Sequence, residues 1–199
     1  MANDKLSTDI RREQITEATL HLLGKKGMRR IKIADIASHI GVVPSAIYRH
    51  FRSKDALLSA VLEAIRSRLF HNVESVRQQS DSATERLHGL LMRHAALISE
   101  ERGISCLIFS DELWGQNKER RLRLFRIISG YLDEVAALVR EGQEQGELRP
   151  DLQPEIASRF FLGMVQPAAL LTHMSDGEFD AVAHAAQCWP VFLDMLRRR

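Results

Sequence analysis

Apolar side chains recur along this chain with the spacing of helices that bury one face. Ile33, Ile36, Ala37 and Ile40 lie three or four residues apart and stop before Gly41. Comparable apolar stripes fall within residues 15–23, 57–73, 87–98, 124–138, 156–165 and 182–196. No segment alternates apolar and polar residues between turn signals, as an amphipathic strand would. The pattern therefore predicts an all-α protein.

A polar stretch at residues 78–82 separates two groups of these stripes. We place an N-terminal domain at residues 8–68 and a second helical domain at residues 75–199. The chain has 199 residues, of which 45% are hydrophobic and 6% aromatic, so a core built mainly from aliphatic side chains is expected.

Charge is unevenly divided between these regions. Residues 1–54 hold 11 Lys and Arg against 5 Asp and Glu, whereas the remainder holds 17 against 21. A basic head on a mildly acidic body indicates that the head meets a polyanion such as DNA.

The segment at residues 33–51 has the features of a helix-turn-helix. Gly41 follows the first short stripe, at a place where a left-handed residue ends a helix at low cost. Pro44 suits the first turn of the next helix, because its missing N–H would be unpaired there. Ile47 and Phe51, four residues apart, would anchor that helix on the core.

Anchoring that face leaves small, polar and basic side chains on the exposed and flanking positions of the second helix: Ser45, Ala46, Tyr48, Arg49 and His50. Such a helix suits the major groove of DNA, with its first residues near the bases. The alternative is a tight packing corner that binds nothing.

The stretch from Ile36 to Val42, followed by Ala46 to Leu58, resembles the DNA-binding region of TetR-family transcriptional regulators. Its most specific part is Tyr48-Arg49-His50-Phe51-Arg52-Ser53-Lys54-Asp55-Ala56-Leu57, and the likeness covers residues 10–65. The resemblance implies a three-helix DNA-binding domain, with the helix-turn-helix at about residues 31–50, followed by a helical ligand-binding and dimerisation domain.

The resemblance also implies roles for individual residues. Tyr48, His50 and Lys54 would contact the DNA backbone, while Ser45, Ala46 and Arg49 would lie near bases. The full predicted DNA-binding set is Lys32, Pro44, Ser45, Ala46, Tyr48, Arg49, His50 and Lys54.

Two positions depart from the family pattern. Lys32 stands where a Ser or Thr usually caps the first short helix, and Ala34 stands where an Arg is common. Because Lys cannot accept a capping hydrogen bond, we expect another cap there and a phosphate contact from Lys32.

The second domain is expected to bind a small, largely apolar effector and to pair two chains through the last two helices. Apolar residues at 160–171 and 191–196 would form the homodimer contact, unless they are intramolecular core. The candidate effector-binding residues are Met92, His94, Cys106, Phe109, Trp114, Phe125, Phe161, Met164 and Gln166. Each of them could instead be ordinary core.

Other function classes find little support in the sequence. There is no phosphate-binding glycine loop, nucleophile elbow or His-Glu-x-x-His motif, so we expect neither an enzyme nor a cofactor. The chain has two cysteines, and no two histidines stand four residues apart, as a metal site on a helix would require. We therefore predict no metal site. We expect no membrane span and no secretory signal, hence a cytoplasmic protein.

These observations predict a transcriptional regulator, a repressor that binds a palindromic operator in double-stranded DNA as a dimer and is released by an effector. The alternative is a DNA-binding architectural or partner-recruiting protein without a small-molecule effector.

Overall fold

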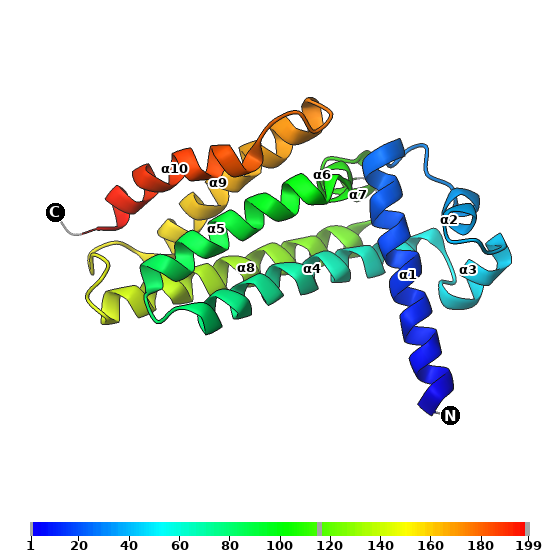
Figure 1. The fold of residues 1–199 in the computed structure, drawn as a ribbon, viewed down its shortest axis with the longest axis horizontal. Helices are drawn as coiled ribbons and strands as arrows, with labels where there is room; N and C mark the ends of the chain where they lie inside the picture. The colour runs from blue at the N-terminus through cyan, green and yellow to red at the C-terminus, as the bar shows by residue number, and fades with distance from the viewer. Residues whose placement is uncertain (1, 115–116, 198–199) are drawn as a thin grey trace. The chain divides into compact units, whose positions relative to one another are not determined.

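A computed structural model of the chain describes residues 2–114 and 117–197, with the side chains of residues 8–111, 113 and 117–197. Every regular element in these ranges is a helix (Figure 1), which confirms the predicted all-α class. The chain divides into two compact units, Met1–Arg66 with Glu101–Arg121, and Ser67–Glu100 with Leu122–Arg199.

The first unit, here called the head, is built around three N-terminal helices. They are α1 (Ala2–Lys26), α2 (Ile33–His39) and α3 (Pro44–His50), and the start of α4 (Lys54–Gln79) continues the chain. Short helices α6 (Arg102–Ile108) and α7 (Asp111–Trp114) also belong to the head. The head core is mainly aliphatic, with Phe51 as its buried aromatic residue, and it includes Ile15, Leu20, Leu23, Ile36, Ile47, Leu57, Leu58, Val61, Leu62, Leu107 and Leu113.

Helix α6 packs on α1 through two glycines. A Cβ atom built on Gly24 would lie 3.0 Å from the amide nitrogen of Gly103, and one built on Gly103 would overlap the backbone of Leu20. The two helix backbones therefore approach closely only because both residues lack a side chain.

The second unit, here called the body, consists of helices that lie beside one another. It contains the rest of α4, α5 (Ala83–Glu100), α8 (Lys118–Glu144) from Leu122 onward, α9 (Pro154–Met174) and α10 (Ala181–Leu196). Helix α5 packs against α9 and α10, and α9 and α10 pack against each other. Their shared core includes Leu87, Leu90, Leu91, Tyr131, Val135, Leu138, Phe161 and Phe192.

Polar contacts also tie α4, α5 and α8 together. The carboxylate of Glu141 accepts hydrogen bonds from the guanidinium groups of Arg77 and Arg86, the latter at 2.9 Å. Glu147 accepts from the hydroxyl of Ser82 at 2.8 Å and the amide of Thr84 at 2.9 Å, which fixes the start of α5.

Helix α1 ends at Lys26, directly before Gly27, whose φ of 73° lies in the left-handed region. Helices α6 and α7 were not predicted as separate elements. Residues 101–114 and 117–121 group with the head, whereas the expected second domain contained them. The division at residues 68–75 stays a prediction.

Among the described helices, none combines the length and apolarity required to span a bilayer.

Candidate nucleic-acid interface

The turn between α2 and α3 is set by local backbone chemistry. Gly41 has a φ of 71°, and its amide donates to the carbonyl of Ser38. The amide of Val42 donates to the carbonyl of Ala37 at 2.9 Å. These two bonds form a Schellman motif, which ends α2 and redirects the chain into α3.

The start of α2 lacks a cap from the side chain of Lys32, as expected. The backbone N–H of Lys32 donates instead to the carboxylate of Asp35 at 2.8 Å, and the Lys26 ammonium contacts the same carboxylate at 2.7 Å. The hydrogen bond from Lys26, with that from the Lys32 amide, lowers the pKa of Asp35. Asp35 therefore stays ionised and holds α2 in place.

Helix α3 begins with Pro44 in its first turn and buries one face. Ile47 is fully buried and Phe51 is 2% exposed, so both anchor the helix on the head core. The opposite side presents exposed Ser45, Tyr48 and Arg49. This arrangement leaves one side of α3 open for a ligand.

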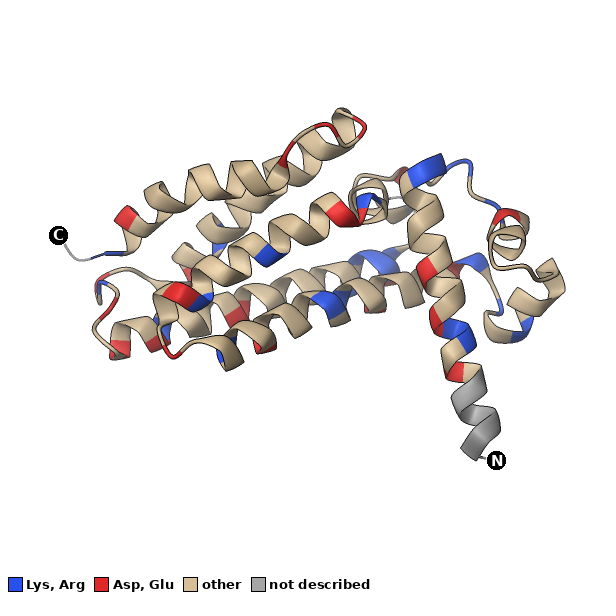
Figure 2. Cartoon of the chain, viewed as in Figure 1, with Lys and Arg blue, Asp and Glu red and all other residues tan. Residues whose placement is uncertain are grey.

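Seven of the eight predicted DNA-binding residues lie on α3 or just after it, and the eighth, Lys32, lies at the start of α2. Lys32 flanks the start of α2, Lys54 opens α4, and the others lie on α3. Lys32, Pro44, Ser45, Tyr48, Arg49 and Lys54 are exposed, while Ala46 and His50 are half-buried. Across residues 27–54 there are six Lys and Arg against one acidic residue (Figure 2), and that acid, Asp35, is already bound to Lys26.

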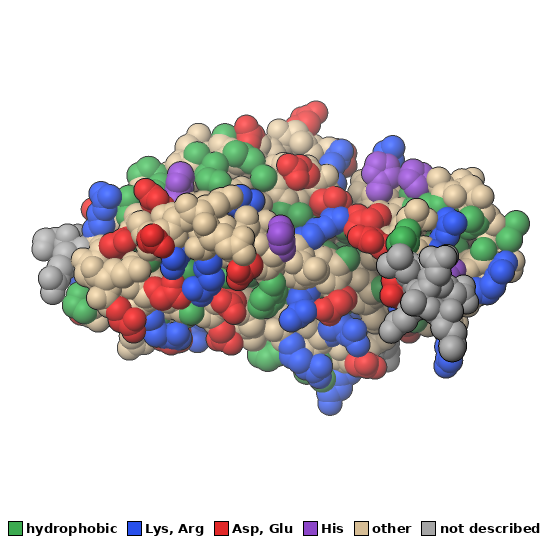
Figure 3. All heavy atoms as spheres, turned by 60° about the horizontal axis from the view of Figure 1, so that its bottom comes forward, with side chains coloured by type: hydrophobic (Ala, Val, Ile, Leu, Met, Phe, Trp, Pro, Cys, Tyr) green, Lys and Arg blue, Asp and Glu red, His purple; other side chains and the backbone are tan. Residues whose placement is uncertain are grey.

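The positive charge of this surface contrasts with the body, where Lys, Arg, Asp and Glu side chains are interspersed on the face seen in Figure 3. A polyanion is therefore attracted to the head.

Arg12 fastens α1 to the end of α3. Its guanidinium donates to the backbone carbonyl of His50 and lies 4.3 Å from the centre of the Phe51 ring. A cation–π contact of this kind helps to hold α3 against α1.

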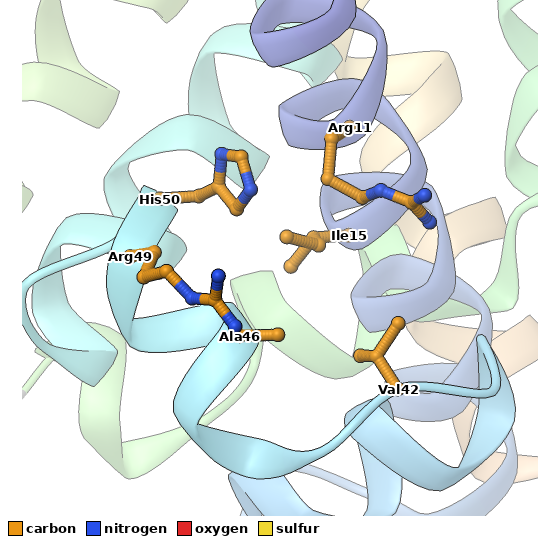
Figure 4. Close-up of a pocket in the computed structure, with 6 residues that line it drawn as sticks. All are labelled: Arg11, Ile15, Val42, Ala46, Arg49 and His50. Carbon is orange, nitrogen blue, oxygen red and sulfur yellow. The ribbon is translucent and has the colours of Figure 1, made fainter.

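A pocket of about 210 Å³ lies between α1 and α3 and is lined by Arg11, Ile15, Val42, Ala46, Arg49 and His50 (Figure 4). Two arginines and a histidine face it, and its lining contains no carboxylate. Burial, with the positive charges of Arg12, Arg11 and Arg49, lowers the pKa of His50. The pocket is thus suited to an anion.

Arg11 and Arg12 were not among the predicted DNA-binding residues. Both precede the first buried position of the α1 stripe, Ile15, so the sequence shows them only as part of the basic head. Their place beside α3 depends on how α1 packs, which no local motif encodes.

The nine candidate effector-binding residues are divided between the two units. Cys106 and Phe109 lie in the head, at α6 and its C-terminal end; Trp114 ends α7, and its side chain lies outside the described residues. Six lie in the body: Met92 and His94 on α5, Phe125 on α8, and Phe161, Met164 and Gln166 on α9. Phe161 is buried, Phe125 is 65% exposed, and the other four are half-buried.

The body brings His94 and Phe161 together through a residue that sequence reasoning missed, Tyr131. The Nδ1 atom of His94 lies 3.0 Å from the Tyr131 hydroxyl, and the rings of Tyr131 and Phe161 are 6.5 Å apart. The series of rings continues to Phe192 and Trp189 on α10. Tyr131 was visible in the sequence only as a single aromatic residue within an aliphatic stripe.

Burial reinforces the neutral forms of His94 and Tyr131 at physiological pH. It lowers the pKa of His94 to about 4 and raises that of the Tyr131 phenol above its usual range. The imidazole and the phenol can therefore donate and accept hydrogen bonds while neither carries a charge.

Two family models match the sequence in succession. The first, described as "Bacterial regulatory proteins, tetR family", matches residues 15–61. The second, "YsiA-like protein, C-terminal region", matches residues 64–194, which is more than half of the chain. The chain belongs to the TetR family of transcriptional regulators.

Similar TetR-family relatives include proteins with different described roles. The "Fatty acid metabolism regulator protein" of Bacillus subtilis is 24% identical over 85% of this chain and 87% of its own length. The "Nucleoid occlusion factor SlmA" of Marinobacter nauticus is 31% identical over 77% of this chain and 75% of its own length.

A solved structure shares the fold. The transcriptional regulator FadR of Bacillus subtilis, in complex with stearoyl-CoA, superimposes with a TM-score of 0.78. That match is 22% identical and covers 93% of this chain and 99% of the other. As a TetR-family regulator, this protein binds DNA, and the exposed side of α3 is the candidate surface.

Proposed function

We propose that this protein is a repressor that binds a palindromic operator as a homodimer in the cytoplasm and leaves it when a small, largely apolar effector binds. The observation that carries the proposal is the contrast between the buried and the exposed face of α3. Ile47 and Phe51 are buried, while Ser45, Tyr48 and Arg49 are exposed in a strongly basic segment.

In this proposal the residues around α3 divide into two roles. Tyr48, His50, Lys54 and Lys32 hold backbone phosphates, which fixes the position of the helix on the duplex. Ser45 and Ala46, at the N-terminal end of α3 after Pro44, approach the base edges in the major groove.

The homodimer is supported by an apolar surface on α9 and α10. On α9, exposed apolar side chains recur along one face, and Val191 on α10 is 75% exposed. The α9 members are Phe160, Leu170, Leu171 and Met174, with exposed fractions between 40% and 72%. Apolar surface of this extent on two adjacent helices is typical of an interface between subunits.

The effector proposal rests on the body core. Half-buried Met92 and Met164 lie on α5 and α9, the helices that also carry His94 and Phe161, and the methionine side chain adapts readily to apolar ligands. We therefore propose that an acyl-type chain enters among these residues, with the uncharged His94–Tyr131 pair bonding a neutral carbonyl. Phe125 and Gln166 would complete the site in the body, whereas the candidacy of Cys106, Phe109 and Trp114 remains a prediction from the sequence.

The solved relative that contains stearoyl-CoA supplies the probe for a direct test. We expect stearoyl-CoA to weaken binding of the protein to its operator duplex by roughly 10-fold or more, a coupling in the usual allosteric range. Coenzyme A without the acyl chain is the matched control and should have no effect. Fluorescence anisotropy of the labelled duplex measures both.

The substitution His94→Leu distinguishes specific release by a bound effector from non-specific, detergent-like release by the acyl chain. The variant should still bind the duplex but respond less to stearoyl-CoA. If stearoyl-CoA releases the variant and the wild type equally, the proposed role of His94 is wrong.

A second candidate function is supported by the 31% identity to a nucleoid occlusion factor. In that case the protein binds specific DNA sites in order to recruit a partner, and no small molecule releases it. Unchanged DNA binding across a panel of acyl thioesters and other apolar compounds, together with an intact operator preference, would favour this alternative.

A further inference from the structure

The pocket between α1 and α3 carries positive charge, and no described carboxylate lines it. Its polar lining consists of the guanidinium groups of Arg11 and Arg49 and the imidazole of His50 (Figure 4). The acidic residue closest in sequence to α3 on its N-terminal side, Asp35, is occupied by Lys26 and the Lys32 amide.

His50 adds a second observation. Its Nδ1 atom is buried and has no hydrogen-bond partner among the described residues. A buried ring nitrogen without a partner is costly unless a ligand or water satisfies it. The atom belongs to a residue that lines the pocket.

We propose that Arg11, Arg49 and His50 form a single anion site that receives one backbone phosphate of the bound duplex. The inference rests on the proposed operator binding and extends it in two ways. It adds α1 to the DNA-contacting elements, and it assigns Arg49 to a phosphate instead of a base. Guanidinium groups suit this role because each can form two charge-assisted hydrogen bonds to phosphate oxygens.

The lining of the pocket suits a phosphate. Ile15, Val42 and Ala46 supply its apolar part, so its only polar side chains among the described residues are the two guanidinium groups and the imidazole. The volume of about 210 Å³ leaves room for a phosphate group and bridging water.

The same site predicts a coupling between DNA binding and protonation. Burial, together with the positive charges of Arg12 and Arg11 on α1 and Arg49 on α3, favours the neutral form of His50. A phosphate in the pocket offsets these charges, which raises the pKa of His50 and draws a proton onto the ring. Since binding then takes up a proton, affinity for DNA should rise as the pH falls from about 8 to about 6.

The decisive experiment compares Arg11→Ala with Arg66→Ala, using the operator duplex recovered by selection. Arg66 is an exposed arginine of the same unit, paired with Glu63 on α4, so its loss removes the same formal charge outside the pocket. We expect Arg11→Ala to reduce the slope of log K against log salt by about one for each head and to weaken binding about 10-fold per head. Arg66→Ala should change neither clearly, and Arg11→Lys should retain most of the slope.

Several outcomes would overturn the inference. The first is a salt dependence of DNA binding in Arg11→Ala equal to that of the wild type. The second is an equal loss of DNA affinity in Arg11→Ala and Arg66→Ala. The third is a pH dependence of DNA binding that is unchanged in His50→Gln. Tight binding of inorganic phosphate by the free protein, measured by calorimetry, would show instead that the pocket holds a free anion. If the wild type fails to prefer any duplex, the proposed function fails, and that result is distinct from all of these.

Discussion

Replacing Val191 with glutamate is expected to convert the protein from a dimer to a monomer at micromolar concentration. Val191 is 75% exposed on α10 and lies in the apolar surface proposed to pair two copies. In a two-fold interface each substitution occurs twice, so two unpaired carboxylates would be buried. We expect the dimer to be weakened by about 3 kcal/mol or more, which is over 100-fold in the dissociation constant.

Sedimentation velocity over a range of concentrations measures this directly. Leu122→Glu is the matched control, because Leu122 is an apolar residue of the body that is 42% exposed but lies on α8. The Val191 variant should also lose roughly 100-fold in affinity for a palindromic duplex, since its two heads are no longer linked. A Val191→Glu protein that remains dimeric would place the subunit interface elsewhere.

Replacing Gly103 with alanine is expected to destabilise the head strongly. The new Cβ would overlap the carbonyl oxygen of Leu20 and lie 2.9 Å from its carbonyl carbon, and Leu20 itself is fully buried. Because the obstacle is backbone and not the end of a flexible side chain, α1 and α6 must move apart. We expect a loss of about 3 kcal/mol in the free energy of unfolding of the head, the upper end for overpacking.

Two measurements test this expectation: urea unfolding, which gives the free energy of unfolding, and native-state hydrogen exchange of the α1 amides. Arg102→Ala serves as the control, because it changes an exposed side chain next to Gly103 and keeps its Cβ; its effect should stay within about 0.5 kcal/mol. Equal protection of α1 in Gly103→Ala and the wild type would mean that the close approach of the two helices is not required.

The helix-turn-helix could be predicted from the sequence because its determinants are local. The left-handed glycine at Gly41, the proline at the start of α3 and the four-residue spacing of Ile47 and Phe51 act over a few residues, and the structure has all three. The alternative cap at Lys32 could be anticipated in the same way, although its identity, Asp35, had to come from the structure.

Features that join distant segments could not be read from the chain. Packing of α6 on α1 depends on Gly24 meeting Gly103, and neither glycine is unusual in its own segment. Likewise, Arg11 comes beside Arg49 and His50 only through the packing of α1 on α3. Composition could suggest candidate effector residues, but it could not assign them to separate units or add Tyr131 to them.

Selection of bound duplexes from a random DNA library by the purified protein, at near-physiological salt, tests the central claim most directly. The account predicts recovery of a palindrome whose half-sites are separated by about one helical turn, 34–36 Å, or slightly more. Recovery of no preferred sequence, with binding that disappears as the salt concentration rises, would contradict it and leave only non-specific attraction between the basic head and DNA.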